Sequence, residues 1–152
     1  MIILDNATEE DVLEFAKNIR PMDAKEVEVV SRKPFEDHIG YLLKHLKEFM
    51  VIKCDGVILG IGAWYQEMVD RGVYSDGVIG WMLLTNAVEG HKIEFLRWSK
   101  EIVKTILDGY PYITNRVYNS NLLHVKYLVF LGASFWEDQF RKDIWHFIIE
   151  RS

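Results

Sequence analysis

The first third of the chain places apolar residues at helical spacing after a short apolar run at residues 1–4. Thr8 can cap a helix, and Asp11, three residues later, gives that helix an acidic first turn. Apolar residues then recur every three to four positions until Pro21, where the helix must stop. We predict a strand at the start of the chain, followed by helices over about 8–19, over 23–31 and after Pro34.

The period changes at Phe49 from that of a helix to that of a strand. The pair Asp55-Gly56 stands between two β-branched runs, which is typical of a two-residue hairpin turn. An apolar run at 78–84 then indicates a buried strand. The later elements are predicted as a helix over about 92–108, a strand at 113–118, a helix at 121–131 ended by Gly132, and strands at 134–136 and 144–149.

The predicted order is therefore β-α-α-β-β-β-α-β-α-β-β, which counts two helices before the hairpin although three segments there carry a helical pattern. No segment repeats and no linker-like composition interrupts the pattern, so we expect a single domain over residues 1–152. With 152 residues, 49% of them hydrophobic, the chain is long enough for one well-packed core and too short for two ordinary ones.

Net charge and cysteine content limit the classes of partner and the cellular compartment that we expect for the protein. A net charge of −5 gives no field that would attract nucleic acid or an anionic membrane, so we expect neither as a partner. Cys54 is the only cysteine, which excludes an intrachain disulfide and favours a reducing compartment. The first residues lack the basic and long apolar segments of a signal peptide. We expect the protein in cytoplasm or in a virus particle.

The histidines give no metal-binding motif. No His-x-x-x-His or Glu-x-x-His pair shares a helical face, so no metal site is predicted. Cys54 has no evident histidine partner in the sequence and is expected in the core rather than as a nucleophile. The five histidines are His38, His45, His91, His124 and His146.

The element order and the stretch YNSNLLHVKYLVFLGASF, from Tyr118 to Phe135, resemble the GCN5-related N-acetyltransferase (GNAT) superfamily. Asn121, ten residues before Leu131-Gly132, matches the family's asparagine, short helix and LGF segment. The resemblance covers essentially the whole chain. It implies an α/β fold with a mixed, twisted sheet of six or seven strands, helices on both faces and a cofactor cleft beside the central parallel pair.

A narrower similarity joins IRPMDAKEV, FLRWSKEIV and VKYLVFLGASF to GNAT-like internal virion or morphogenesis proteins of short-tailed phages. It implies a phage protein in the host cytoplasm or the virion. Its expected partner is a virion or host protein, or a second copy of the chain.

In the family, a loop of pattern Gln/Arg-x-x-Gly-x-Gly/Ala at the start of the long helix binds the pyrophosphate of coenzyme A through backbone N–H groups. The same register here places Glu89, Lys92 and Glu94 at the three defining positions, and none of them matches. Acidic residues in a first turn also stabilise a helix, which is the alternative explanation for both glutamates. The positions that this register assigns to the coenzyme A cleft are Leu84, Glu89, Gly90, His91, Lys92 and Asn121.

Many members also carry a tyrosine on the short helix that protonates the leaving thiolate. Here that position is Leu128, and the adjacent Tyr127 is turned by about 100° around the helix. If the protein is active, Tyr118, Tyr127 and Asp76 are the candidate catalytic residues. The alternative is that the tyrosines are half-buried packing residues and that Asp76 lies in a solvated acidic loop.

The sequence leaves open whether the protein is an enzyme. We predict a GNAT-fold phage protein that is degenerate as an acetyltransferase, needs no cofactor, and binds proteins in virion assembly or host contact. The alternative is a divergent N-acetyltransferase that uses acetyl-CoA and acts on a small amine or a protein amine. Five Trp, seven Tyr and eight Phe exceed what a small core hides. The expected aromatic contact patch is Trp64, Tyr65, Trp136 and Trp145.

Overall fold

The structure is a computed structural model that describes residues 1–152. Contacts within the chain form two compact units. Unit 1 comprises Met1–Ala63 and Met82–Trp98, and unit 2 comprises Trp64–Trp81 and Ser99–Ser152. The single domain expected from the sequence stays a prediction.

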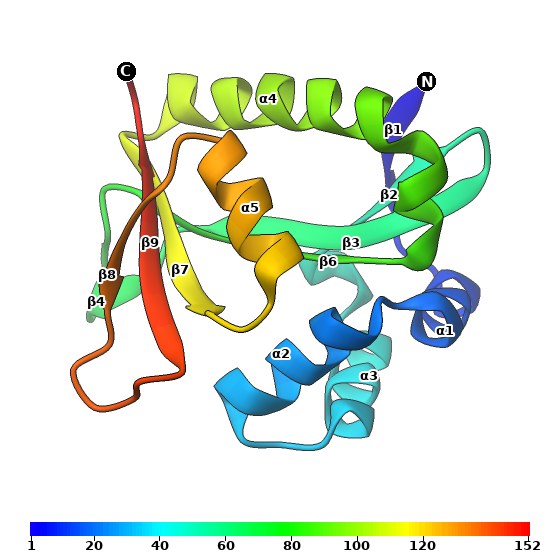
Figure 1. Cartoon of the computed structure of the whole chain (residues 1–152), viewed down its shortest axis with the longest axis horizontal. Helices are drawn as coiled ribbons and strands as arrows, with labels where there is room; N and C mark the ends of the chain where they lie inside the picture. Colours follow the sequence, from blue (N-terminus) through cyan, green and yellow to red (C-terminus); the bar gives the residue numbers. More distant parts are fainter. The chain divides into compact units, whose positions relative to one another are not determined.

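Seven strands form one mixed sheet in the order β1-β2-β3-β6-β7-β9-β8, which confirms the predicted α/β fold with six or seven strands. A separate two-stranded sheet, β4-β5, was not predicted. The strands of the large sheet are β1 (Ile2–Asn6), β2 (Met50–Cys54), β3 (Val57–Tyr65), β6 (Val78–Leu84), β7 (Tyr112–Tyr118), β8 (Ser134–Glu137) and β9 (Ile144–Glu150) (Figure 1). The small sheet consists of β4 (Met68–Asp70) and β5 (Val73–Tyr74).

Unit 1 contains three helices before its first hairpin, so the predicted order was wrong in counting two. They are α1 (Glu9–Asn18), α2 (Pro21–Ser31) and α3 (Phe35–Lys44), followed by the 3-10 turn η1 (Leu46–Glu48). Thr8 caps α1 as predicted, and the Asp11 side chain bonds back to the Thr8 backbone to form a capping box. Pro21 ends one helix and begins the next at its first position, where the missing N–H is not needed. Pro34 likewise precedes α3, which packs against both α1 and α2.

The hairpin of β2 and β3 turns at Asp55-Gly56 as predicted. Both residues have positive φ, 50° and 81°, which is the backbone of the tight turn that matches the twist of a hairpin. β1 pairs antiparallel with β2. The core of unit 1 is formed by apolar residues of α1 and of these strands, among them Val12, Phe15, Val51, Ile52, Leu59 and Ile61.

Unit 2 contains the parallel pair that the family resemblance implied. Val78 pairs with Ile113 and Ile79 with Thr114. At the next position the side-chain amide of Asn115 donates to the carbonyl of Gly80 at 3.0 Å. A side chain at Gly80 would lie 2.7 Å from a methyl carbon of Ile113, so this close strand approach requires glycine. β7, β9 and β8 continue as antiparallel neighbours.

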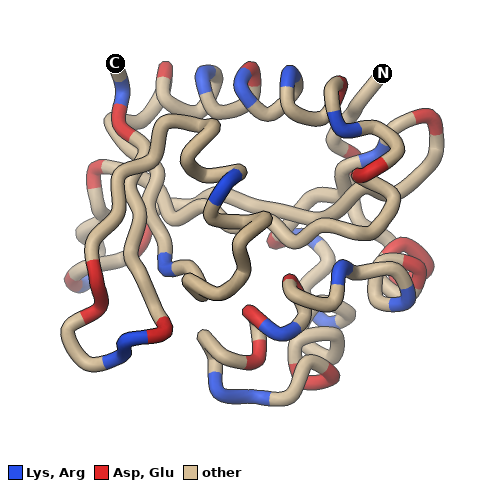
Figure 2. Tube along the Cα trace, in the orientation of Figure 1, with Lys and Arg blue, Asp and Glu red and all other residues tan.

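Two helices complete the fold. The 3-10 turn η2 (Asn86–His91) leads directly into α4 (Lys92–Gly109). This confirms the long helix predicted over about 92–108. Residues of both charge signs follow one another along α4 (Figure 2). α5 (Leu122–Phe130) ends before Gly132, whose φ of 90° makes it the predicted terminal glycine. No helix is long and apolar enough to cross a membrane.

Candidate functional site

In unit 1, the end of β6 is held from the β3 side by Thr85. Its backbone N–H donates to Leu59 O at 2.9 Å, and its hydroxyl donates to Ile58 O at 2.8 Å. Thr85 is completely buried. Backbone groups of successive strand residues point to opposite edges, so the N–H and C=O of Leu84 point away from β3.

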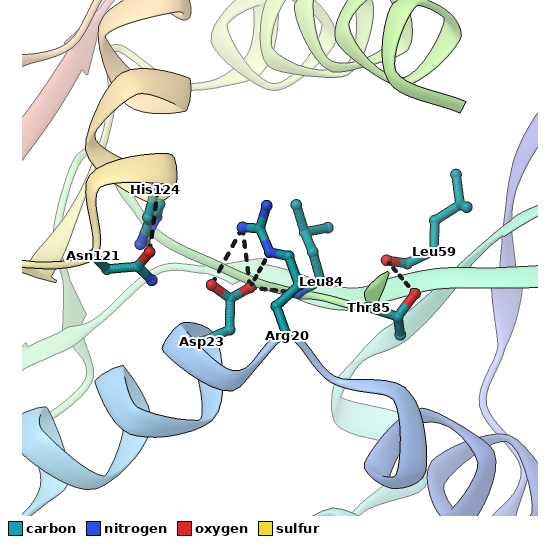
Figure 3. A network of polar contacts seen from close by, with 7 residues as sticks. All are labelled: Arg20, Asp23, Leu59, Leu84, Thr85, Asn121 and His124. Atoms are coloured by element: carbon teal, nitrogen blue, oxygen red, sulfur yellow. Dashed lines mark hydrogen bonds and ion pairs between the residues drawn. The ribbon is translucent and has the colours of Figure 1, made fainter. Parts of the chain in front are cut away.

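That opposite edge is occupied at Leu84 by the segment between α1 and α2. The backbone N–H of Arg20 donates to Leu84 O at 2.9 Å, and Leu84 N donates to Asp23 Oδ2 at 2.8 Å. Ile19 forms an antiparallel bridge with Thr85. Figure 3 shows the Asp23 carboxylate between the Arg20 guanidinium and the backbone of Leu84. Both backbone groups of Leu84 are therefore bound within the chain.

Arg20 and Asp23 form a buried ion pair. Arg20 Nη2 lies 3.2 Å from Asp23 Oδ1, and the two side chains are 12% and 4% exposed. Such a pair is costly to break, because removing one partner leaves an uncompensated charge inside the protein. The segment on the Leu84 edge is thus fixed by side chains as well as by backbone.

The segment that stands at the position of the family's pyrophosphate loop lies on η2 and the first turn of α4. Glu89, Gly90 and Lys92 are exposed, and His91 is half-buried. A side chain built at Gly90 would meet nothing within 4 Å. Glu94 instead turns to its own chain: its Oε1 lies 3.1 Å from the Met1 ammonium and its Oε2 accepts from the Cys54 thiol at 3.5 Å.

Glu94 belongs to a cluster with Cys54 and His91. One ligand atom from each of the three residues lies within 4.8 Å of the others. The Met1 ammonium and then the thiol hold the pKa of Glu94 below its usual range. Burial and then the Glu94 carboxylate raise the pKa of the Cys54 thiol. Because the thiolate is the reactive form, Cys54 is poorly suited to act as a nucleophile.

In unit 2, the candidate site residues Asn121 and Tyr127 are hydrogen-bonded within the fold. Asn121 is buried and caps α5 by accepting from His124 N at 3.5 Å (Figure 3), while its own N–H donates to Tyr118 O. The Tyr127 hydroxyl donates to the buried Ser99 hydroxyl of α4 at 2.7 Å. Asp76 is exposed between β5 and β6.

Leu128, which stands where the family carries its tyrosine, is 4% exposed. It belongs to the apolar core of unit 2, so this position serves packing. The other members of that core are Val78, Ile106, Ile113, Val117, Phe147 and Ile149.

Three of the four residues expected in the aromatic patch are exposed. Trp64 and Tyr65 are 38% and 51% exposed, and Trp136 is 49% exposed. Trp145 is half-buried and packs on Phe135. The exposed apolar residues continue from Trp64 into the β4-β5 hairpin. We call this set the hairpin patch: Trp64, Tyr65, Met68, Val69, Val73 and Tyr74.

A family model described as bacteriophage T7, probable scaffold protein Gp13, matches residues 48–140. The chain belongs to this family. No curated protein matches it.

Solved structures show that this Gp13-family chain has the GNAT fold. The acetyltransferase AAC(6')-Ib in complex with ribostamycin and coenzyme A is 14% identical, with a TM-score of 0.70, over 99% of this chain and 93% of that one. A GNAT-family acetyltransferase from Bacillus anthracis is 10% identical, with a TM-score of 0.68, over 98% and 94%. A spermidine N-acetyltransferase chimera from Vibrio cholerae and hSSAT has 10% identity and a TM-score of 0.64, over 98% and 95%.

Sequence reasoning placed Leu84 and the η2 segment in the site but missed what contacts them. Arg20 and Asp23 were not candidates, because an Arg/Asp pair three residues apart is a common surface pattern. The Cys54 cluster was missed for a similar reason. The only sign of this cluster in the sequence is the spacing His91-x-x-Glu94, which reverses the Glu-x-x-His order typical of metal sites on helices.

Proposed function

We propose that this phage protein has lost acetyl transfer and works by binding another protein during virion assembly, in the host cytoplasm or in the virion. The loss of acetyl transfer is supported by one observation: the backbone N–H and C=O of Leu84 are already hydrogen-bonded to Asp23 and Arg20. By family register this residue lies at the coenzyme A cleft. A cofactor arm that pairs with this strand edge needs the same N–H and C=O that Asp23 and Arg20 already hold.

Displacing the bound segment would be unfavourable. A hydrogen bond to a charged group contributes about 1.5–3 kcal/mol, and Asp23 makes such bonds to both Leu84 and Arg20. Opening the edge would also leave the Arg20 guanidinium without its carboxylate partner. At the loop, Lys92 and Glu94 add side chains where the acetyltransferases present backbone N–H groups to phosphate.

The hairpin patch supports the second half of the proposal. Apolar side chains exposed in one short segment are typical of a surface that another protein covers. The segment 66–77 carries three acidic residues, Glu67, Asp70 and Asp76, against Arg71 alone. We therefore expect a protein partner with an apolar contact surface and basic residues around it. The family's description as a probable scaffold protein agrees with such a role.

Calorimetry with acetyl-CoA at low salt tests the loss of cofactor binding. We expect a Kd in the millimolar range or weaker, with an active acetyltransferase of this fold as the positive control. Low salt favours any electrostatic contribution, so weak binding there is decisive. Micromolar binding would overturn the proposal.

Complementation tests the binding role. A phage that lacks this gene is grown in cells that supply either the natural protein, Val69→Asp or the matched control Leu13→Asp. Val69 is 61% exposed and Leu13 is 51% exposed. Leu13 is a suitable control because it lies on α1, outside the segment 64–74 that contains the hairpin patch. We expect Val69→Asp to lower the yield of infectious particles at least about tenfold and Leu13→Asp to leave it unchanged. Equal yields would contradict the role of the hairpin patch.

The second candidate is a divergent N-acetyltransferase that uses acetyl-CoA and acts on a small amine or a protein amine. Two observations favour it: the similarity to a coenzyme A complex and the open space at Gly90. Tyr118, Tyr127 and Asp76 would then be the residues to test. This function predicts acetyl transfer to a polyamine or a peptide amine that falls in Tyr118→Phe or Tyr127→Phe, and the leading proposal predicts no transfer at all.

A further inference from the structure

We propose that Cys54, His91 and Glu94 of unit 1 form a zinc-binding site. Cys54 is the last residue of β2, beside the hairpin turn, whereas His91 ends η2 and Glu94 lies in the first turn of α4. The three residues are brought together by the fold across 40 residues of sequence. The proposal does not rest on the loss of acetyl transfer, because its test measures metal binding and not coenzyme A binding.

The donor set suits zinc. Thiolate sulfur, imidazole nitrogen and carboxylate oxygen are its usual ligands, and three protein ligands with one open position are typical of accessible zinc sites. Softer thiolate and imidazole ligands disfavour Mg²⁺ and Ca²⁺, which prefer oxygen.

The distances fit with little adjustment. Bond lengths of about 2.3 Å to sulfur and 2.1 Å to oxygen place these two ligand atoms about 3.6 Å apart in a tetrahedral site. Cys54 Sγ and Glu94 Oε2 are 3.5 Å apart. The ligand atoms of all three residues lie within 4.8 Å of one another, so the His91 ring nitrogen would move closer by about 1 Å to complete a tetrahedral site.

The surroundings leave a place for the metal ion. The thiol hydrogen now lies between Cys54 Sγ and Glu94 Oε2, and the ion would replace it: the S–H bond breaks, its proton passes to solvent and a sulfur–metal bond forms. Glu94 Oε1 stays with the Met1 ammonium at 3.1 Å. Cys54 is buried while Glu94 is exposed, so a water from the open side can be the fourth ligand.

Binding would join the β2-β3 hairpin to the start of α4. It should also depend on pH, because the thiol must lose its proton. The charged and titratable groups around that thiol are Glu94, His91, Asp55 and the Met1 ammonium. Zinc affinity should therefore increase with pH.

Titration with Zn²⁺ and Co²⁺ under a non-thiol reductant tests the site. We expect one ion per chain, release of about one proton in calorimetry at neutral pH, and a sulfur-to-cobalt charge-transfer absorption. Cys54→Ala should abolish that absorption. His91→Gln and Glu94→Gln should each weaken binding at least about tenfold. Glu101→Gln, an exposed carboxylate further along α4, is the matched control and should bind as the natural protein does.

Glu94→Gln separates loss of a zinc ligand from loss of the fold. The Glu94 side chain is 48% exposed, so its replacement should not unfold the chain. Circular dichroism would show that each variant is folded. The proposal is overturned if the natural protein binds no stoichiometric ion, if the cobalt absorption survives in Cys54→Ala, or if Glu101→Gln weakens binding as much as Glu94→Gln.

Discussion

The end of β6 and the hairpin patch differ in how their groups are satisfied: the backbone groups of the first are bonded within the chain, and the apolar side chains of the second are exposed to water. At Leu84 and Thr85, every backbone contact described above is made to the chain itself, through Arg20, Asp23 and Leu59. In the hairpin patch, apolar side chains such as Val69 are left in water, at 61% exposure. The N–H and C=O of Leu84 already have partners within the chain, whereas exposed apolar surface becomes more stable when another molecule covers it.

Unit 2 shows the same contrast within a single helix. Leu128 on α5 is buried in the core, and the neighbouring Tyr127 hydroxyl is bound to Ser99. On the same helix Leu122 and Val129 are 65% and 59% exposed. The Leu128 side chain therefore packs in the core, while Leu122 and Val129 add to the exposed apolar surface of unit 2.

The largest effect is expected from Asp23→Ala. This change leaves the Arg20 guanidinium buried without its carboxylate and removes the acceptor of Leu84 N. Urea denaturation should show a loss of about 3–5 kcal/mol in the free energy of unfolding. The exposed Asp76→Ala is the control and should change it by less than about 0.5 kcal/mol. A loss below about 1 kcal/mol for Asp23→Ala would mean that the β6 edge is not firmly closed.

The next effect is expected from Leu128→Tyr, which restores the family's residue. Leu128 is 4% exposed, so the larger ring must displace core neighbours such as Val117. We expect a loss of about 1–3 kcal/mol and no acetyl transfer. Leu128→Met, which nearly conserves volume, should cost less than about 1.5 kcal/mol. A stable Leu128→Tyr variant that transfers acetyl groups would show that only the tyrosine had been lost.

Local patterns predicted the fold far better than the site. The strand at 78–84 and the Asp55-Gly56 turn were predicted residue for residue, because each depends on neighbours in sequence. The β4-β5 hairpin was missed because strands of three and two residues are too short to show a period. The Asp23–Leu84 bond spans 61 residues, and such a pairing exists only once the chain has folded.

A smaller effect is expected from Tyr127→Phe. The change removes the 2.7 Å hydrogen bond to Ser99, a residue that is completely buried, and should cost about 1 kcal/mol. Combining it with Ser99→Ala in a double-mutant cycle isolates the contribution of this contact. If Tyr127 is instead catalytic, stability will hold while acetyl transfer falls. No coupling between the two changes would also contradict the structural role.

The smallest effect is expected at the turn between β8 and β9. Asp138 Oδ1 lies 2.7 Å from His146 Nε2, and its Oδ2 accepts from Phe140 N and Arg141 N at 3.0 and 2.9 Å. The histidine contact first, and then the backbone N–H of Phe140, hold the pKa of Asp138 below its usual range. The contacts fix a turn whose Phe140 side chain is 87% exposed, so they order an apolar tip that the fold itself does not cover.

The sign of the pH dependence follows from that lowered pKa. The stabilising contribution of Asp138 is complete above its unfolded-state pKa of about 3.9 and is lost as the pH falls through the lower folded-state value. The Trp136 ring stacks on His146 at 5.5 Å, so its fluorescence should report the opening of the turn. Asp138→Asn removes the titrating group, and its acid profile should lack the change that the natural protein shows below about pH 4. Identical profiles would mean that other carboxylates control the turn, and that the ordered tip does not depend on Asp138.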